Sequence, residues 1–414
     1  MVELKRIKSA PCGAAHGCYD CPSEYCPHRT VYSDEIEIVS DHSYEPGRAE
    51  GIAIDIGTTT VAAARYENGR QTACVRELNA GVRWGADVIS RIGAASGSAA
   101  REITARMRRQ IADITERLDG EGHKTIIAAN TAMTCLLTGM DVSGLRTYPF
   151  SVPSLDTIFE GHKTIIGGIG AFVGGDIVSG LYMCGFGKSD DINMLIDLGT
   201  NGEIAIGNKN GIICTSAAAG PAFEGGGISC GMGTVPGAIC SVQLSGGIVT
   251  IGHEKPKGIC GTGIVELLYE LLRMGYMDDT GLLASQYQDG FPVTDGIIIT
   301  QKDIRGIQTA KSAIRAACEL IMKEYGADNI KNVYIAGGFG RGLDIKKACG
   351  IGLLPDTLEA KCVSVGNSSL GGAVKLLDND CDTTAIERIR SVSESFDLAE
   401  RREFSELFLE YMNF

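Results

Sequence analysis

Two short stretches of the sequence carry the same set of residues suited to holding phosphate and magnesium. One reads GIAIDIGTTTVAAA from Gly51, and the other reads MLIDLGTNGEIAIG from Met194. Each is an apolar strand that ends in an aspartate, followed by a turn of glycine with hydroxyl or amide residues and by a second strand. The aspartate can hold a hydrated metal ion, and the glycines let backbone N–H groups approach phosphate oxygens. Either stretch alone also fits an ordinary tight turn. Their repetition favours two similar halves that face one nucleotide.

The candidate residues for this chemistry follow directly from the repeated pattern. Asp55 and Asp197 are expected to hold Mg²⁺ through waters. The phosphate contacts are expected from the two turns, namely Gly57, Thr58, Thr59, Thr60, Gly199, Thr200, Asn201, Gly202 and Glu203.

A second group of candidate residues lies in the first thirty positions. Cys12, Cys18, Cys21 and Cys26 are interleaved with glycine and proline and cannot build a hydrophobic core of their own. Metal binding would supply the folding energy of such a segment. The compact spacing favours an iron–sulfur cluster, with [4Fe–4S] fitting better than [2Fe–2S]. Structural zinc, with His16 or His28 as further ligands, is the alternative, and free thiols on a tail are the third possibility.

Composition excludes several classes of protein. The 414 residues include 44% hydrophobic and 21% charged residues, and the net charge is −13. An acidic chain with no basic stripe is not expected to bind nucleic acid. We find no signal peptide and no apolar run long enough to span a bilayer, so the expectation is a cytoplasmic protein without membrane contact. In that compartment the 15 cysteines are not expected to form a disulfide framework.

The pattern of apolar residues and breakers divides the chain into five parts. We predict a Cys-rich segment over 1–30, a linker over 31–49, a first subdomain over 50–190, a second over 191–382 and a charged helical extension over 383–414. The predicted elements include helices over 98–118, 177–184 and 301–325, strands over 124–129, 333–336 and 362–365, and a hairpin over 238–252.

Three smaller features complete the predictions made from the residues. The glycine-rich segment 216–227 is expected to wrap closely around a ligand, and Gly261 opens a helix whose N-terminus could hold an anion. Lys311 and Arg315 share one face of the helix over 301–325. Cysteines on apolar helix faces are interpreted as core, and Trp84 as a packing anchor; these cysteines include Cys135, Cys184 and Cys318.

Eight motifs in order resemble one family. They are DIGTTT, NTAMTCLLTG, VGGDI, DLGTNGE, SAAAGPAFEG, DIRGIQTAKSAIRA, AGGFG and VGNSSLGGA. The paired turns and the late AGGFG resemble the acetate and sugar kinase, heat-shock chaperone and actin superfamily. Within it the match is closer to the reductive activators of corrinoid proteins, over roughly residues 50–380. The resemblance implies an α/β fold of two similar actin/ribonuclease-H-like subdomains around a nucleotide cleft, preceded here by the short Cys-rich metal-binding segment.

The same resemblance implies an activity and further site residues. The family uses ATP to return Co(II) to Co(I) in the corrinoid protein of a methyltransferase system, with an electron donor protein as a second partner and a homodimeric assembly. Asp176, which precedes the predicted helix over 177–184, becomes the candidate to orient the attacking water, while a helix N-cap is its alternative role. The segment Gly337, Gly338, Phe339 and Gly340 matches the adenosine-binding motif of the superfamily.

The chain also departs from the family pattern. Bacterial activators carry an N-terminal [2Fe–2S] ferredoxin domain and archaeal relatives a C-terminal two-cluster ferredoxin, whereas here about fifty residues precede Asp55 and no cysteine follows residue 383. Two other activities therefore stay open. One is an ATP-dependent kinase of a sugar or small acid, and the other an ATPase activator of a 2-hydroxyacyl-CoA dehydratase, although Cys230 and Cys260 do not match the cluster pattern of the latter. A chaperone is less well supported because no separate substrate-binding domain follows.

Overall fold

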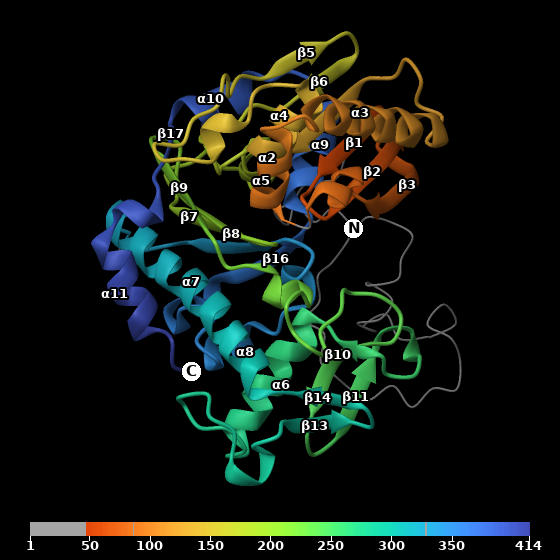
Figure 1. The fold of residues 1–414 in the computed structure, drawn as a ribbon. Coiled ribbons are helices and arrows are strands. Elements are labelled where there is room, and N and C mark those ends of the chain that lie inside the picture. Colours follow the sequence, from red (N-terminus) through yellow and green to blue (C-terminus); the bar gives the residue numbers. More distant parts are fainter. Residues whose placement is uncertain (1–46, 86, 328) are drawn as a thin grey trace.

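The computed structural model describes residues 47–414 apart from residues 86 and 328. The four N-terminal cysteines and the iron–sulfur or zinc site expected from them lie outside the described residues. In the described part, two six-stranded sheets stand one above the other, and a smaller lobe extends below them (Figure 1). None of the helices described is both long and apolar enough to cross a membrane.

The first sheet is built from residues 51–165 and has the strand order β3-β2-β1-β4-β6-β5. Its strands are β1 (Gly51–Ile56), β2 (Thr60–Glu67), β3 (Arg70–Leu78), β4 (Thr125–Ala129), β5 (Ile158–Glu160) and β6 (Lys163–Ile165). The second sheet has the order β16-β15-β7-β8-β9-β17. Its strands are β7 (Asn193–Leu198), β8 (Gly202–Gly207), β9 (Ile212–Ala217), β15 (Asn332–Ala336), β16 (Cys362–Gly366) and β17 (Ser393–Ser395).

The strand pairing confirms two similar halves. In the first sheet β1 runs antiparallel to β2 and parallel to β4, and in the second β7 runs antiparallel to β8 and parallel to β15. Asp55 is in register with the last part of β4, and Asp197 with the last residue of β15. The two aspartates therefore occupy equivalent positions, each at the carboxyl end of a central strand.

A layer of two helices lies between the sheets. These are α5 (Gly175–Met183) and α9 (Ser368–Asp378), and small residues on the inner face of the first sheet, including Ala53, Ala62 and Ala128, let them approach closely. The helices also touch each other tightly, since a Cβ atom at Gly372 would lie 2.0 Å from the carbonyl oxygen of Ser179. Although α9 follows β16 of the second sheet, it packs against β1 and β4 of the first. This crossing carries residues of the second half to the first aspartate.

The outer faces of both sheets are covered by further helices. Alternate strand residues such as Ile52, Ile54 and Ile56 point away from the central layer and contact α3 and α4, as the two-residue period of a strand requires. Met194 and Ile196 do the same against α7. The covering helices are α2 (Val88–Ala95), α3 (Ala100–Arg117), α4 (Thr131–Thr138) and α7 (Gln301–Tyr325). The cysteines expected in the core are buried there, namely Cys135, Cys184 and Cys318, and Trp84 packs against the first-sheet core.

The predicted elements agree with the observed ones within a few residues. The helix over 301–325 is α7, which begins with a capping box between Thr300 and Asp303 and ends at left-handed Gly326. The predicted hairpin is β10 (Ala238–Gln243) with β11 (Gly247–Thr250) in the lower lobe. That lobe also holds β12 (Gly258–Ile259), α6 (Gly261–Arg273), β13 (Phe291–Thr294), β14 (Ile297–Ile299) and α8 (Ile345–Gly350) (Figure 1).

The C-terminal segment is more than the helical extension expected from the sequence. Between α10 (Thr384–Ser391) and α11 (Arg402–Glu410), the three residues of β17 pair in parallel with β9 and extend the second sheet. Helix α11 lies along α7, where the buried ammonium of Lys311 donates to the carbonyls of Tyr411 at 2.7 Å and Asn413 at 2.5 Å. The shared face of α7 predicted for Lys311 and Arg315 therefore anchors this segment. A strand of three residues is too short to produce a recognisable alternation of apolar residues, so the sequence alone does not predict it.

Candidate functional site

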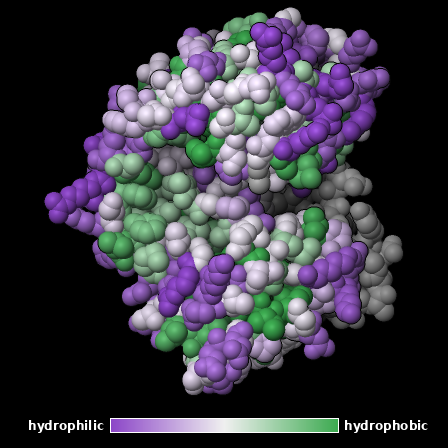
Figure 2. Space-filling model, viewed as in Figure 1, coloured by the Kyte–Doolittle hydropathy of each residue, from purple (hydrophilic) through white to green (hydrophobic). Residues whose placement is uncertain are grey.

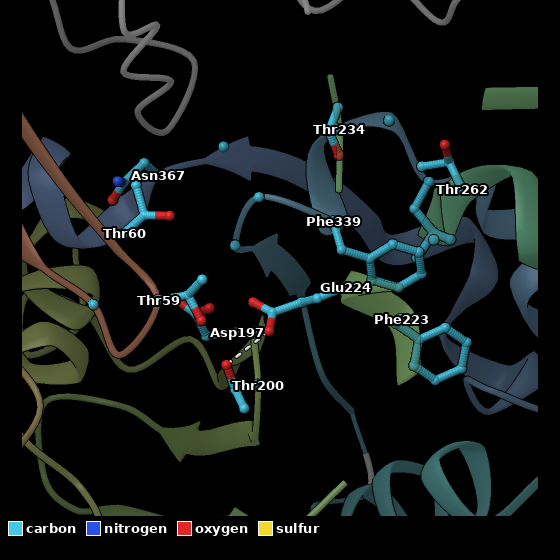
Figure 3. A pocket seen from close by; sticks show the side chains of 18 of the residues that line it. Thr59, Thr60, Asp197, Thr200, Phe223, Glu224, Thr234, Thr262, Phe339 and Asn367 are labelled. Carbon is cyan, nitrogen blue, oxygen red and sulfur yellow. Dashed lines mark hydrogen bonds between the residues drawn. The ribbon is translucent and has the colours of Figure 1, made fainter. Parts of the chain in front are cut away.

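A cleft of about 1150 Å³ opens where the two repeated turns meet. Its lining comes from the carboxyl ends of β1 and β7, from the start of α5 and α6, and from the loops after β9, β15 and β16. In space-filling view a hollow crosses the molecule between its upper and lower parts (Figure 2). Side chains from distant parts of the sequence converge in it (Figure 3).

The first turn is held in place by two asparagines. Buried Asn79 donates from its amide to the carbonyl of Gly57 at 2.8 Å, and its backbone N–H donates to the carbonyl of Thr59 at 2.9 Å. Asn130, the N-cap of α4, donates from its side chain to the hydroxyl of Thr58 at 3.1 Å. The turn is therefore supported from β3 and from α4, so its backbone N–H groups keep a fixed direction.

Asp55 is fixed by residues from the other half of the chain. Asn367 donates from its amide to Oδ2 and Ser369 from its hydroxyl to Oδ1, each at 2.8 Å. Burial raises the pKa of Asp55, and these two hydrogen bonds and the charge of Arg76 offset part of that effect. These two hydrogen bonds are possible because α9 packs against the first sheet, and they fix the orientation of the Asp55 carboxylate.

The second turn faces the first across the cleft. Asp197 is the last but one residue of β7, and burial together with the nearby carboxylates of Asp176, Asp55 and Glu224 raises its pKa to about 8. The hydroxyl of Thr200 donates to Oε2 of Glu224 at 2.8 Å. Figure 3 shows Glu224 pointing toward Asp197 and Thr200.

Carboxyl groups are concentrated on the floor of the cleft. Burial raises the pKa of Glu203 well above its usual value, reinforced by Asp176 and Asp197. The described lining residues include eight carboxylates and only two basic side chains, Arg76 and Lys346. Such a floor repels a bare polyphosphate, so an anion of this kind needs an accompanying cation.

Asp176 lies in the first turn of α5, one residue past its first helical position. The N-cap is Gly174, so the N-cap interpretation of Asp176 is wrong. Its Oδ1 accepts the N–H of Ile177 at 2.8 Å, and burial, with a contribution from Asp55, raises its pKa to about 7. Asp176 enters the cleft because α5 begins beside Asn130, where a Cβ atom at Gly174 would lie 2.5 Å from the Cα atom of that asparagine.

An aromatic wall stands beside the third glycine-rich turn. Phe339 stacks on Phe223 with ring centroids 5.0 Å apart and planes 19° from parallel, and Figure 3 shows the Phe339 ring between Phe223 and Thr262 of α6. A Cβ atom at Gly261 would lie 1.9 Å from the carbonyl oxygen of Phe223, so only glycine lets α6 begin so close to this wall. A flat apolar surface next to a polar floor suits a nucleoside base joined to phosphates.

The structure brings most of the predicted site residues into this one cleft. The lining includes the three aspartates and most residues of the three turns, namely Gly57, Thr58, Thr59, Thr60, Gly199, Thr200, Asn201, Glu203, Gly337, Gly338 and Phe339. Gly202 and Gly340 are not among the lining residues. A Cβ atom at Gly202 would meet Ile314 of α7 at 3.0 Å, and one at Gly340 would meet Ile335 at 2.9 Å, so both glycines serve close packing.

The sequence does not by itself single out several polar and aromatic residues of the site. They are Asn79, Asn130, Phe223, Glu224, Thr262, Asn367 and Ser369. Five of them fall in quoted motifs or in the predicted ligand-wrapping loop, but their residue types are common in turns and caps. Only tertiary contacts reveal their places, both within one half, as for Asn130 with Thr58 and Glu224 with Thr200, and between the halves, as for Asn367 with Asp55.

Comparison with protein families identifies two matching regions. A model described as the RACo middle region matches residues 50–189. A second, described as the C-terminal domain of RACo, the ASKHA domain, matches residues 191–414. Together they span nearly all of the described chain.

Individual relatives and a solved structure agree with these models. The corrinoid activation enzyme RamQ of Eubacterium limosum is 31% identical, over 87% of this chain and 69% of that protein. A reductase of the Co(II) methylated amine-specific corrinoid protein from Methanosarcina barkeri is 31% identical over 50% of this chain and 42% of its own length. The solved reductive activator for a corrinoid, iron-sulfur protein superposes with a TM-score of 0.77 at 30% identity, over 89% of this chain and 66% of that one. This chain thus spans about two thirds of the two more extensive matches.

Proposed function

The chain belongs to the RACo family, and we propose that it is an ATPase that reactivates a corrinoid protein by returning Co(II) to Co(I). The names of the relatives support the corrinoid partner, and the match to a reductive activator supports the direction of electron transfer. The observation that carries the ATPase part is the convergence of the two aspartate turns on one cleft beside the Phe223–Phe339 wall.

The residues of the cleft fit a magnesium-bound nucleotide. Asp55 and Asp197 would hold the ion through waters, which agrees with the absence, among the described residues, of three ligand side chains close enough to bind a metal directly. Magnesium keeps several waters and takes one or two carboxylates plus phosphate oxygens. When bound, Mg²⁺ with ATP supplies the transferable phosphate and neutralises the charge that develops on it.

The remaining lining residues have separate roles in this proposal. The backbone N–H groups of the two turns, with the hydroxyls of Thr58, Thr59 and Thr60, would bind phosphate oxygens. Asp176 would orient the attacking water. Phe339 and the backbone of Gly337 and Gly338 would hold the adenosine, since nothing lies within 4 Å of a Cβ atom at Gly338 and the turn is open there.

Binding or hydrolysis of ATP would assist the electron transfer by changing the state of the corrinoid protein. Reduction of Co(II) needs a very low potential, and a nucleotide can help only if the two states of the activator bind the corrinoid protein differently. The electron would come from a donor protein, through a cluster on Cys12, Cys18, Cys21 and Cys26. The closing of the two halves around the nucleotide would provide the two states.

The relatives give the kinase alternative little support. Those at 30% identity or more are named for corrinoid activation or corrinoid protein reduction. On the side of the first sheet the lining of the cleft is mixed, with Leu78, Val88 and Phe172 beside Arg76, Asn130 and Thr131, so it does not by itself favour a sugar or a small acid. The dehydratase-activator alternative also lacks support, because the thiol of Cys260 is buried and donates to the carbonyl of Ile239.

The test is ATP-dependent reduction of a Co(II) corrinoid protein without oxygen. Purified chain, ATP, Mg²⁺ and a reductant are mixed with candidate corrinoid proteins of methyltransferase systems, and the cobalt state is followed by absorbance. We expect Co(I) to form with ATP and not with a non-hydrolysable analogue. Phosphorylation of a small acceptor, with no effect on cobalt, would contradict the proposal and favour the kinase.

A further inference from the structure

Glu224 presents a carboxylate oxygen to the centre of the cleft. It ends the short 3₁₀ turn Pro221–Glu224, and its Oε2 accepts the hydroxyl of Thr200 at 2.8 Å. Within the part of the chain that the structure describes, its other oxygen, Oε1, has no hydrogen-bond partner, and the side chain lines the cleft. Figure 3 places the carboxylate next to Asp197 and Thr200, with Thr59 of the first turn on the other side of Asp197.

The other carboxylates of the floor differ from Glu224 in their contacts. Asp197 is the expected metal ligand, and Asp176 keeps one oxygen without a hydrogen bond among the described residues but has no hydroxyl that orients it. Both oxygens of Asp55 accept hydrogen bonds. Asp176 accepts the N–H of Ile177 in its own helix, and Glu203 accepts the hydroxyl of Ser216 at 3.3 Å from the neighbouring strand. Glu224 therefore combines a free oxygen, an orienting hydroxyl and a place beside the expected phosphates.

The backbone around Glu224 is rigid. Gly225 follows in the left-handed region at φ 83°, where a Cβ atom would lie 2.4 Å from the backbone nitrogen of Met232. On the other side, Phe223 stacks on Phe339 and packs against the start of α6. The turn therefore holds its carboxylate in place from both sides, as a general base requires.

We propose that Glu224 accepts the proton of the water that attacks the terminal phosphate, and that Thr200 positions its carboxylate. This inference rests on the proposed hydrolysis of ATP. The water oxygen forms a bond to the terminal phosphorus, and the bond to the bridging oxygen breaks, its electron pair leaving with ADP. One proton of the water passes to Oε1 of Glu224 and the other stays on the phosphate. Glu224 then returns its proton to the solvent of the cleft.

Two amide substitutions separate Glu224 from Asp176. In Glu224→Gln the shape and the contact with Thr200 remain possible but proton uptake is lost, so kcat for ATP hydrolysis is expected to fall about 100-fold or more. Asp176→Asn keeps an oxygen that can orient water, so its loss is expected to be smaller. The affinity of Glu224→Gln for Mg·ATP, measured by calorimetry, is expected to stay within about twofold of the wild-type value. The substitution affects cleavage of the bond to the terminal phosphate and not nucleotide binding.

Further variants at Glu224 and Thr200 give results that a purely structural role of these two residues would not produce. Glu224→Ala leaves space for a small carboxylate, and added formate is expected to restore part of kcat. Thr200→Val is expected to lower kcat with little change in KM, whereas Thr200→Ser keeps the hydroxyl and most of the rate. Glu254→Gln, which changes an exposed glutamate paired with Lys257, is the matched control. Circular dichroism checks that each variant is folded.

The outcomes distinguish this assignment from the function on which it rests. If the wild-type chain hydrolyses ATP and Glu224→Gln retains at least a third of its kcat, Glu224 is not the base. A loss of nucleotide binding that equals the loss of rate, or no response to formate in folded Glu224→Ala, also overturns the assignment. A wild-type chain that binds but never hydrolyses ATP overturns the proposed function itself.

Discussion

Replacing Asp197 with asparagine should stabilise the ligand-free protein while removing its response to Mg·ATP. Asp197 lies beside Asp176, Asp55 and Glu224, and burial with these charges raises its pKa from 3.8 to about 8. A carboxyl group whose pKa is raised by folding destabilises the fold increasingly as pH rises above its unfolded value, and the effect levels off above the folded value. The stability that Asp197→Asn gains over the wild type is therefore expected to increase between about pH 4 and pH 8.

The size of the effect follows from the same shift. A change from 3.8 to about 8 would correspond to about 6 kcal/mol at high pH, and contact with water in the cleft reduces this to roughly 1–3 kcal/mol. For subdomains of this size each kcal/mol moves Tm by about 2–4 °C. We expect Asp197→Asn to unfold roughly 2–12 °C above the wild type at pH 8.5 in EDTA.

A second aspartate provides a control of opposite sign. Asp303 is also buried, and burial alone would raise its pKa, but hydrogen bonds from Ser229 and Thr300 outweigh burial and lower it. It accepts the backbone N–H of Ser229 at 2.7 Å and that of Thr300 at 2.8 Å. Asp303→Asn should therefore lower Tm, since it weakens charge-assisted hydrogen bonds.

The assay is thermal unfolding by circular dichroism, with EDTA and then with Mg·ATP. A ligand at 100 times its Kd stabilises the wild type by about 2.7 kcal/mol, and Asp197→Asn should gain much less. If Asp197→Asn unfolds below the wild type in EDTA, as Asp303→Asn should, the argument from crowded carboxylates is refuted. If Mg·ATP stabilises both equally, Asp197 does not hold the metal.

Four other predictions concern separate parts of the molecule. Gly337→Ala, at φ +90° with its Cβ 2.3 Å from the carbonyl of Leu198, should lower Tm and weaken ATP binding by calorimetry, whereas Gly338→Ala should do neither. In Lys311→Met, loss of the hydrogen bonds that hold residues 411–413 should raise amide exchange of α11 at least about tenfold, while global Tm changes little because a buried charge is also removed. Replacing Cys18 and Cys21 with serine should remove iron by elemental analysis and stop corrinoid reduction by a protein donor while ATP hydrolysis continues; zinc without iron or sulfide would contradict the cluster. Light scattering at micromolar concentration should give a homodimer, and a strictly monomeric species would count against that assembly.

Local chemistry made much of the fold predictable from the sequence. Each aspartate turn and its two strands lie within about fourteen consecutive residues. The repetition of this pattern was enough to predict two halves and the equivalent places of Asp55 and Asp197. The helix over 301–325 could be delimited because its caps, Thr300 and Gly326, lie next to its own periodic pattern. In both cases the residues that determine the structure lie close together in the sequence, so a local sequence pattern can reveal them.

The composition of the cleft was decided only by tertiary packing. Asn367 and Ser369 hold Asp55 across more than 310 residues because α9 crosses between the sheets, and nothing near Asp55 in the sequence indicates them. The Phe223–Phe339 wall and the place of Glu224 depend in the same way on how the loop after β9 meets the loop after β15. Asparagine, serine and phenylalanine have many roles in proteins, so their types alone do not identify a site. The sequence by itself determined the two aspartate turns, and the packing of the two sheets decided which side chains surround them.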